Sequence, residues 1–290
     1  MIRRHPLPAY YTLAFGITWT LWLPRVATEQ DWWARDVPEW WHYTGAAGPV
    51  AAAFIVVALV DGRAGTRALL TQYDPSKLRS PYAVLAFVSL LAMFAVGLVA
   101  ERIAEGGWPA YSEVTKANNL PAIGLPLTAL AQVLTFGIGE ETGWRGFVLP
   151  RLQQSHRALS ATAILVVGWV AWHVPSFFEN PDFRDMTVFT LVGWTSGLAL
   201  GAVLLTWLYN STAAGLLAVA LWHGLFNTIS ASEAASGMIA PVVSTGVMLM
   251  ALIVLVLAGP VQLRGLSRHG ERRVRWSDLL SANGERGNNV

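Results

Sequence analysis

The sequence contains no cysteine and very little charge. Of its 290 residues, 54% are hydrophobic and only 13% are charged, whereas an ordinary soluble domain has roughly 25% charged residues. The absence of cysteine excludes disulfide bonds and thiolate chemistry. The shortage of charge, combined with long uncharged runs, argues against an ordinary soluble fold and indicates a membrane protein.

Eight apolar stretches are long enough to cross a bilayer, since roughly 20 helical residues span its hydrocarbon core. We therefore expect an all-α fold, a polytopic transmembrane helical bundle of about eight spans over residues 1–258. The first stretch is kept as a span because no small-residue cleavage site of a signal peptide follows it. The expected spans are Pro8–Pro24, Thr44–Val60, Pro81–Ala100, Pro121–Gly146, Ala158–Val174, Thr187–Leu208, Thr212–Ser230 and Gly237–Ala258.

The charges in the connecting segments are distributed unevenly. With the N-terminus inside, the cytoplasmic segments carry fourteen Lys or Arg and five acidic residues, and the external segments carry five and eleven. This asymmetry follows the positive-inside rule. We expect an integral, multi-pass protein of a bacterial-type plasma membrane with both termini cytoplasmic.

The last segment, residues 259–290, is basic and polar. We expect it to be a poorly ordered cytoplasmic tail whose RHGERRVRW run contacts anionic lipid headgroups. Arginines in such a tail are weak evidence for nucleic-acid binding. We therefore expect the lipid bilayer, and no nucleic acid, among the partners.

Charged side chains are almost absent from the expected spans. The exceptions are Glu140, Glu141 and Arg145, although a charge at the centre of a helix costs about 2.5 to 3.5 kcal/mol on insertion. Glu141 and Arg145 are four residues apart in the favourable order for an ion pair, so we assign them a structural role. Glu140 lies about 100° around the helix, without that partner, and is free to act as a general base.

Two other spans carry the only histidines within the expected spans, His173 and His223. Trp169 and His173 share one helix face, and Pro175 is expected to end or kink their span. His223 and Asn227 also share a face and offer two donors for an oxyanion. Each cluster alone is more often a packing feature. Three polar clusters in three spans, however, favour one shared buried site.

In chain order these clusters read EExxxR, aromatic-xxx-His and HxxxN. This order resembles the CAAX protease and bacteriocin-processing family (CPBP, or ABI) of intramembrane proteases, which includes the type II CAAX prenyl endopeptidases. The small-residue run Gly45–Ala53 is also similar to the second span of many members, and the resemblance defines a protease-like core at about residues 44–230. The family's second motif usually begins with Phe. Trp169 replaces it here, and we expect little effect because both side chains are large aromatic rings.

The resemblance implies an intramembrane endopeptidase that hydrolyses a peptide bond near the membrane. By position, Glu140 would activate water with help from His173, while His223 and Asn227 would stabilise the oxyanion. Trp169, like Glu141 and Arg145, would support the site structurally. The expected partner is a peptide or a membrane-anchored protein substrate, and the sequence leaves the oligomeric state open.

Three alternatives stay open at this point. Glu140, His173 and His223 match the three-ligand set of a catalytic zinc, but no HExxH motif is present, so a site without a cofactor is favoured. A proton-coupled transporter and a non-catalytic, immunity-type membrane protein are the others.

The expected topology also separates the site residues in depth. It places Glu140 near the cytoplasmic end of the fourth span and His173 near the outer end of the fifth. An extension of the fourth helix to about Leu152 would bring Glu140 closer to mid-membrane.

Overall fold

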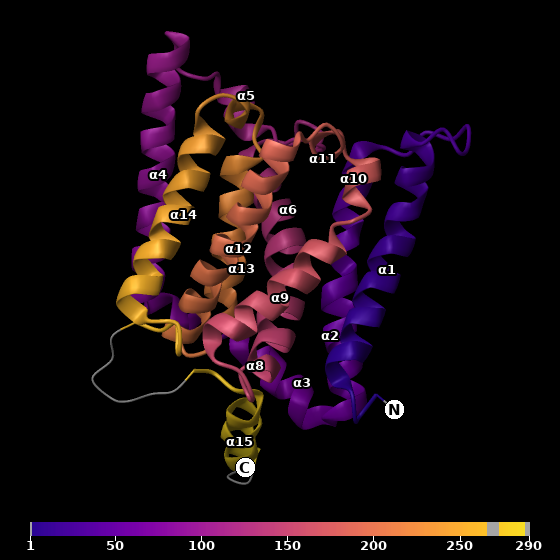
Figure 1. Cartoon of the computed structure of the whole chain (residues 1–290), viewed down its shortest axis with the longest axis vertical. Helices are drawn as coiled ribbons and strands as arrows, with labels where there is room; N and C mark the ends of the chain where they lie inside the picture. The colour runs from indigo at the N-terminus through magenta and orange to yellow at the C-terminus, as the bar shows by residue number, and fades with distance from the viewer. Residues whose placement is uncertain (1, 266–272, 288–290) are drawn as a thin grey trace.

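The computed structural model describes residues 2–265 and 273–287 (Figure 1). This part of the chain is built from helices and contains no strand, which confirms the all-α prediction. The two ends of the chain lie at the same end of the bundle, next to α3, α8 and α15, while α5 and α11 lie at the opposite end (Figure 1).

The first half of the bundle contains two long helices, a 3-10 and α pair, and short connecting helices. They are α1 (Pro6–Glu29), η1 (Glu39–Ala46), α2 (Ala47–Val60), α3 (Gly62–Leu70), η2 (Thr71–Tyr73), η3 (Pro75–Arg79), α4 (Pro81–Glu105) and α5 (Tyr111–Thr115). The middle of the chain forms one continuous helical run made of α6 (Leu125–Gln132), η4 (Val133–Glu140), α7 (Glu141–Gly143), η5 (Trp144–Val148) and α8 (Leu149–Leu152).

The remaining elements surround that central run. They are α9 (Ala158–Trp172), α10 (Ser176–Glu179), α11 (Pro181–Arg184), α12 (Val188–Ser211), α13 (Leu216–Ser230), η6 (Glu233–Ser236), α14 (Ile239–Ala258) and α15 (Trp276–Gly287).

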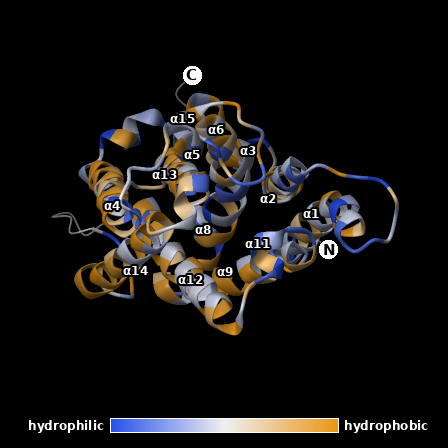
Figure 2. Cartoon of the chain, turned by 90° about the horizontal axis from the view of Figure 1, so that it is seen from above, coloured by the Kyte–Doolittle hydropathy of each residue, from blue (hydrophilic) through white to orange (hydrophobic). Residues whose placement is uncertain are grey.

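Each of the expected spans contains a helix, and five helical segments of the described chain are long and apolar enough to cross a membrane. These segments are Glu39–Val60, Pro81–Glu105, Ala158–Glu179, Val188–Ser211 and Ile239–Ala258, and α13 is a shorter apolar helix. Hydrophobic side chains cover the outward faces of α4 and α14 (Figure 2), as a lipid-facing surface requires. The protein is therefore an integral membrane protein; which side its termini face stays a prediction.

The small residues at the start of α2 allow it to pack closely against α1. A Cβ added at Gly48 would lie 2.0 Å from Thr18 Oγ1 and 2.5 Å from the carbonyl oxygen of Ala14. Only glycine fits at this distance, which is the usual device for close approach of helices in a membrane.

The fourth expected span differs from its predicted bounds. The helix begins at Leu125 and continues to Leu152, with π-helical turns over η4 and η5. Such turns are rare in proteins, and those that occur are often found at functional sites. Because Glu140 ends η4, it lies in the middle of this long helix rather than at its cytoplasmic end.

Within the segment predicted to be the tail, residues 276–287 form α15, which packs on α3. Trp276 is buried because the guanidinium of Arg151 lies between its ring and that of Phe147, 3.7 Å from each ring centre. Arg151 Nη2 also pairs with Asp61 Oδ2 at 2.5 Å. Hydropathy does not detect this packing because a charged side chain is at its centre. Most of the RHGERRVRW run lies outside the described residues.

Candidate active site

Glu140 is 3% exposed, and its carboxylate is held by two tryptophans. Its Oε2 accepts a hydrogen bond from Trp169 Nε1 at 2.7 Å and a longer one from Trp144 Nε1 at 3.3 Å. Both donors bind the same oxygen, so Oε1 is left for a water molecule or a substrate. The sequence analysis named Trp169 as a support of the site but not its bond to Glu140. It missed Trp144, although this residue stands at the i, i+4 position that a helix brings beside Glu140.

Glu141 and Arg145 form the expected pair, with both side chains fully buried. Arg145 Nη1 donates to Oε1 and Oε2 of Glu141 at 2.8 and 3.0 Å, and its guanidinium lies 4.4 Å from the centre of the Trp169 ring. Glu141 has a second partner that the spacing did not predict, since His223 Nδ1 lies 2.7 Å from Glu141 Oε1. Glu141 therefore orients the imidazole of His223, and the Nε2 atom of His223 is left for another ligand.

His173 is the C-cap residue of α9, close to the end of the expected span. Pro175 follows, as expected, and the chain turns there. His173 Nδ1 lies 2.8 Å from the carbonyl oxygen of Trp169. Because a carbonyl only accepts, Nδ1 is the donor in this contact and Nε2 is the remaining nitrogen. The aromatic rings of Phe183 and Trp194 pack against the imidazole, with centroids at 6.0 and 5.3 Å.

One cavity of about 490 Å³ brings the four predicted catalytic residues together. Glu140, His173, His223 and Asn227 all line it, although they come from η4, the end of α9 and α13. The expected topology separated Glu140 from His173, yet both line this cavity, and the extension of the fourth helix to Leu152 places Glu140 near the middle of that helix. These four residues place a carboxylate acceptor, two imidazoles and an amide in a cavity whose walls are mainly apolar. This is the chemistry needed to activate water and to stabilise an oxyanion.

The zinc alternative can be compared with the same geometry. In the described part of the chain, no group of three His, Asp or Glu side chains is arranged so that it could hold a metal ion. Glu141 holds His223 through Nδ1, a contact that zinc-bound histidines also make, so the absence of a metal cofactor stays a prediction.

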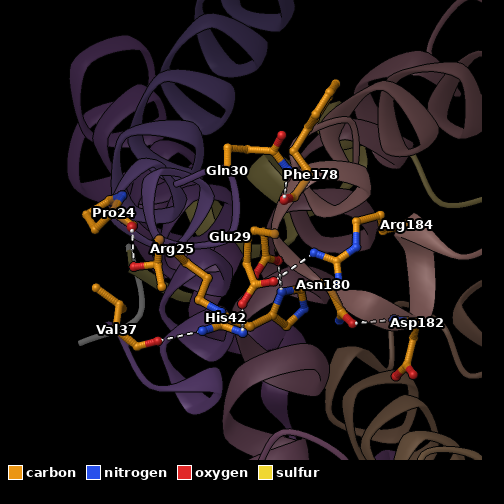
Figure 3. Close-up of polar contacts among 12 residues, drawn as sticks. Pro24, Arg25, Glu29, Gln30, Val37, His42, Phe178, Asn180, Asp182 and Arg184 are labelled. Atoms are coloured by element: carbon orange, nitrogen blue, oxygen red, sulfur yellow. Dashed lines mark hydrogen bonds and ion pairs between the residues drawn. The ribbon is translucent and has the colours of Figure 1, made fainter. Parts of the chain in front are cut away.

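Several cavity residues lie in segments that the sequence analysis treated as external loop. His42 of η1 lines the cavity, and its Nδ1 lies 2.5 Å from Oε1 of the buried Glu179 on α10. Nearby, Glu29 on α1 pairs with Arg25 at 2.6 Å and with Arg184 on α11 at 2.7 Å (Figure 3). These contacts fix α10 and α11 against the N-terminal helices. Arg25 and Glu29 are only four residues apart. The His42–Glu179 and Glu29–Arg184 pairs join residues far apart in sequence, so local spacing does not reveal them.

Comparison with known proteins agrees with the motifs. Residues 122–229 match the family model described as type II CAAX prenyl endopeptidase Rce1-like, a range that contains all the predicted site residues. No curated protein matches the chain. The match supports the resemblance read from the three motifs: residues 122–229 are similar to the type II CAAX prenyl endopeptidases of the CAAX protease and bacteriocin-processing family.

Proposed function

We propose that this protein hydrolyses a peptide bond inside the cavity, with Glu140 as the general base. The observation that carries the proposal is the buried carboxylate of Glu140. Two indoles hold one of its oxygens, and Glu140 lines the same cavity as His173, His223 and Asn227. Such a carboxylate is fixed in position and can accept a proton from water.

In the proposed reaction, Glu140 Oε1 takes a proton from water while the water oxygen attacks the carbonyl carbon. His173, whose Nδ1 is engaged by the Trp169 carbonyl, accepts the second water hydrogen bond through Nε2 and orients the attacking lone pair. The negative charge moves to the carbonyl oxygen. Glu140 then returns its proton to the leaving nitrogen as the carbon–nitrogen bond breaks, giving a carboxylic acid and an amine.

The oxyanion would be stabilised from α13. In its doubly protonated form, His223 donates through Nδ1 to Glu141 and through Nε2 to the oxyanion. The side-chain amide of Asn227 supplies the second donor, since it makes no hydrogen bond among the described residues and lines the cavity. Removing one such donor typically costs two to three orders of magnitude in rate.

The test compares peptide termini by mass spectrometry in membranes that lack the protein or contain the wild type, Glu140→Gln or Glu101→Gln at matched expression. Glu101 is a buried carboxylate outside the cavity, where it accepts from the Met238 amide, so Glu101→Gln controls for the loss of a buried charge. We expect termini that depend on Glu140 and persist in Glu101→Gln. If no terminus depends on Glu140, the proposal fails and a transport or non-catalytic role takes its place.

Metal dependence needs a separate measurement on purified protein. We expect cleavage to survive treatment with a chelator, because water activation is assigned to the carboxylate. Loss of cleavage that added zinc restores would instead support the zinc-dependent version with Glu140, His173 and His223 as ligands.

A further inference from the structure

A buried glutamine in the same cavity has an unused acceptor. Gln132, at the end of α6, is fully buried and lines the cavity. Its Nε2 donates to Tyr43 Oη at 3.1 Å, while its Oε1 has no hydrogen-bond partner among the described residues.

The neighbouring hydrogen bonds fix which end of the amide is unpaired. The Tyr43 hydroxyl donates its single proton to the carbonyl oxygen of Asn118 at 3.3 Å, so towards Gln132 it can only accept. The amide nitrogen must therefore face Tyr43, and the carbonyl oxygen is the atom left over. Buried acceptors in native proteins nearly always have a donor, so this one indicates a partner that enters the cavity.

The position of Gln132 relative to Glu140 indicates the kind of partner. Gln132, Phe136 and Glu140 follow one another at intervals of four residues and all line the cavity. Eight α-helical residues rise about 12 Å, and the wider π-helical turns of η4 make the distance shorter. An extended peptide therefore covers it in three to four residues at most. A substrate with its scissile carbonyl at Glu140 would therefore place a backbone amide near Gln132.

The wall contributed by α12 leaves room for such a chain. Gly193, Gly197 and Gly201 line the same cavity, and a Cβ added at any of them would meet no heavy atom within 4 Å. These glycines are therefore not used for close packing against another helix. They instead widen the cavity along its length.

We propose that Gln132 Oε1 accepts the backbone N–H of an extended substrate peptide, three or four residues from the scissile bond. The inference rests on the proposed endopeptidase function. It adds a subsite that positions the main chain of the substrate. The subsite should accept any side chain on the substrate residue whose N–H it binds, with proline as the one exception. Proline has no N–H to donate, so it should be disfavoured there.

The experiment uses the termini that depend on Glu140 in membranes containing the wild type, Gln132→Met or Gln154→Met. Gln154 is exposed and lies outside the cavity, so Gln154→Met is the matched control for the same chemical change. In the wild type and the control, we expect proline to be depleted about tenfold at one position three or four residues from the cut. In Gln132→Met, this depletion should disappear.

A cleaved sequence is then synthesised with an ester in place of that single amide, which removes the N–H. The wild type should cut the ester about tenfold more slowly than the amide, while Gln132→Met should cut both at the same rate. Tyr43→Phe provides a second variant, because loss of the hydroxyl frees the Gln132 amide to rotate. It should reduce the difference between the cleavage rates of the amide and the ester.

The subsite would be overturned, and the endopeptidase left intact, by either of two results. In the first, the ester slows the wild type and Gln132→Met equally; in the second, the wild type accepts proline at every position. Absence of any terminus that requires Glu140 would instead refute the endopeptidase itself, and the subsite with it.

Discussion

Removing the positive charge of Arg145 should destabilise the protein strongly. Arg145 and Glu141 are both fully buried, and two hydrogen bonds of 2.8 and 3.0 Å join them. Arg145→Met would leave the Glu141 carboxylate with His223 as its remaining side-chain partner. Removing one partner of a buried ion pair costs about 3 to 5 kcal/mol. We therefore expect a loss of that size in the free energy of unfolding.

A double-mutant cycle separates the pair from general effects of mutation. Glu141→Gln combined with Arg145→Met removes both charges, so its cost should be smaller than the sum of the single costs by about 2 kcal/mol or more. The assay is reversible unfolding in bicelles, with Lys116→Met as control, because the Lys116–Glu233 pair is about 40% exposed and should be worth less than about 1 kcal/mol. Additive costs, or an Arg145→Met cost no larger than that of Lys116→Met, would refute the reasoning.

Three further predictions concern the cavity and the tail. Trp169→Phe keeps an aromatic side chain but removes the 2.7 Å hydrogen bond to Glu140. It should lower kcat about tenfold or more with little change in KM. An unchanged kcat would support the expectation that Phe and Trp are equivalent at this position. Gly197→Leu should fold normally and block cleavage, since its side chain enters open space in the cavity, whereas Gly16→Leu, also in open space but outside the cavity, should leave cleavage unchanged. Trp276→Ala should reduce stability by about 3 kcal/mol, measured as a lower midpoint of thermal unfolding, because the ring is buried against Arg151.

The helices could be predicted from the sequence because a hydrocarbon core excludes charge and unpaired backbone groups. The run from Pro121 to Gly146 was recognised in this way, but its end was not. The expected span ended at Gly146, before the segment that contains Arg151, whereas the structure continues the helix to Leu152 and buries Arg151 between two aromatic rings. Tertiary packing decided that boundary, and hydropathy does not contain this information.

The candidate site divides in the same way. The Glu141–Arg145 pair follows from i, i+4 spacing on one helix, and the structure forms it. The bonds from Trp169 to Glu140 and from His223 to Glu141 join different helices, so they depend on how α9 and α13 pack against the central helix. Gln132 could not be recognised from the sequence because its unpaired oxygen exists only once Tyr43 of η1 occupies the amide nitrogen.

The two adjacent glutamates have different surroundings because consecutive residues of a helix point about 100° apart. Glu141 is directed toward Arg145 and His223, where both of its oxygens are bound. Glu140 is directed toward the cavity, where indole donors hold only Oε2. The indoles carry no charge, so they fix the Glu140 carboxylate without forming an ion pair with it. One residue of helical rotation thus gives the chain a carboxylate that holds His223, the proposed oxyanion donor, and, beside it, a carboxylate whose second oxygen is left for the proposed chemistry.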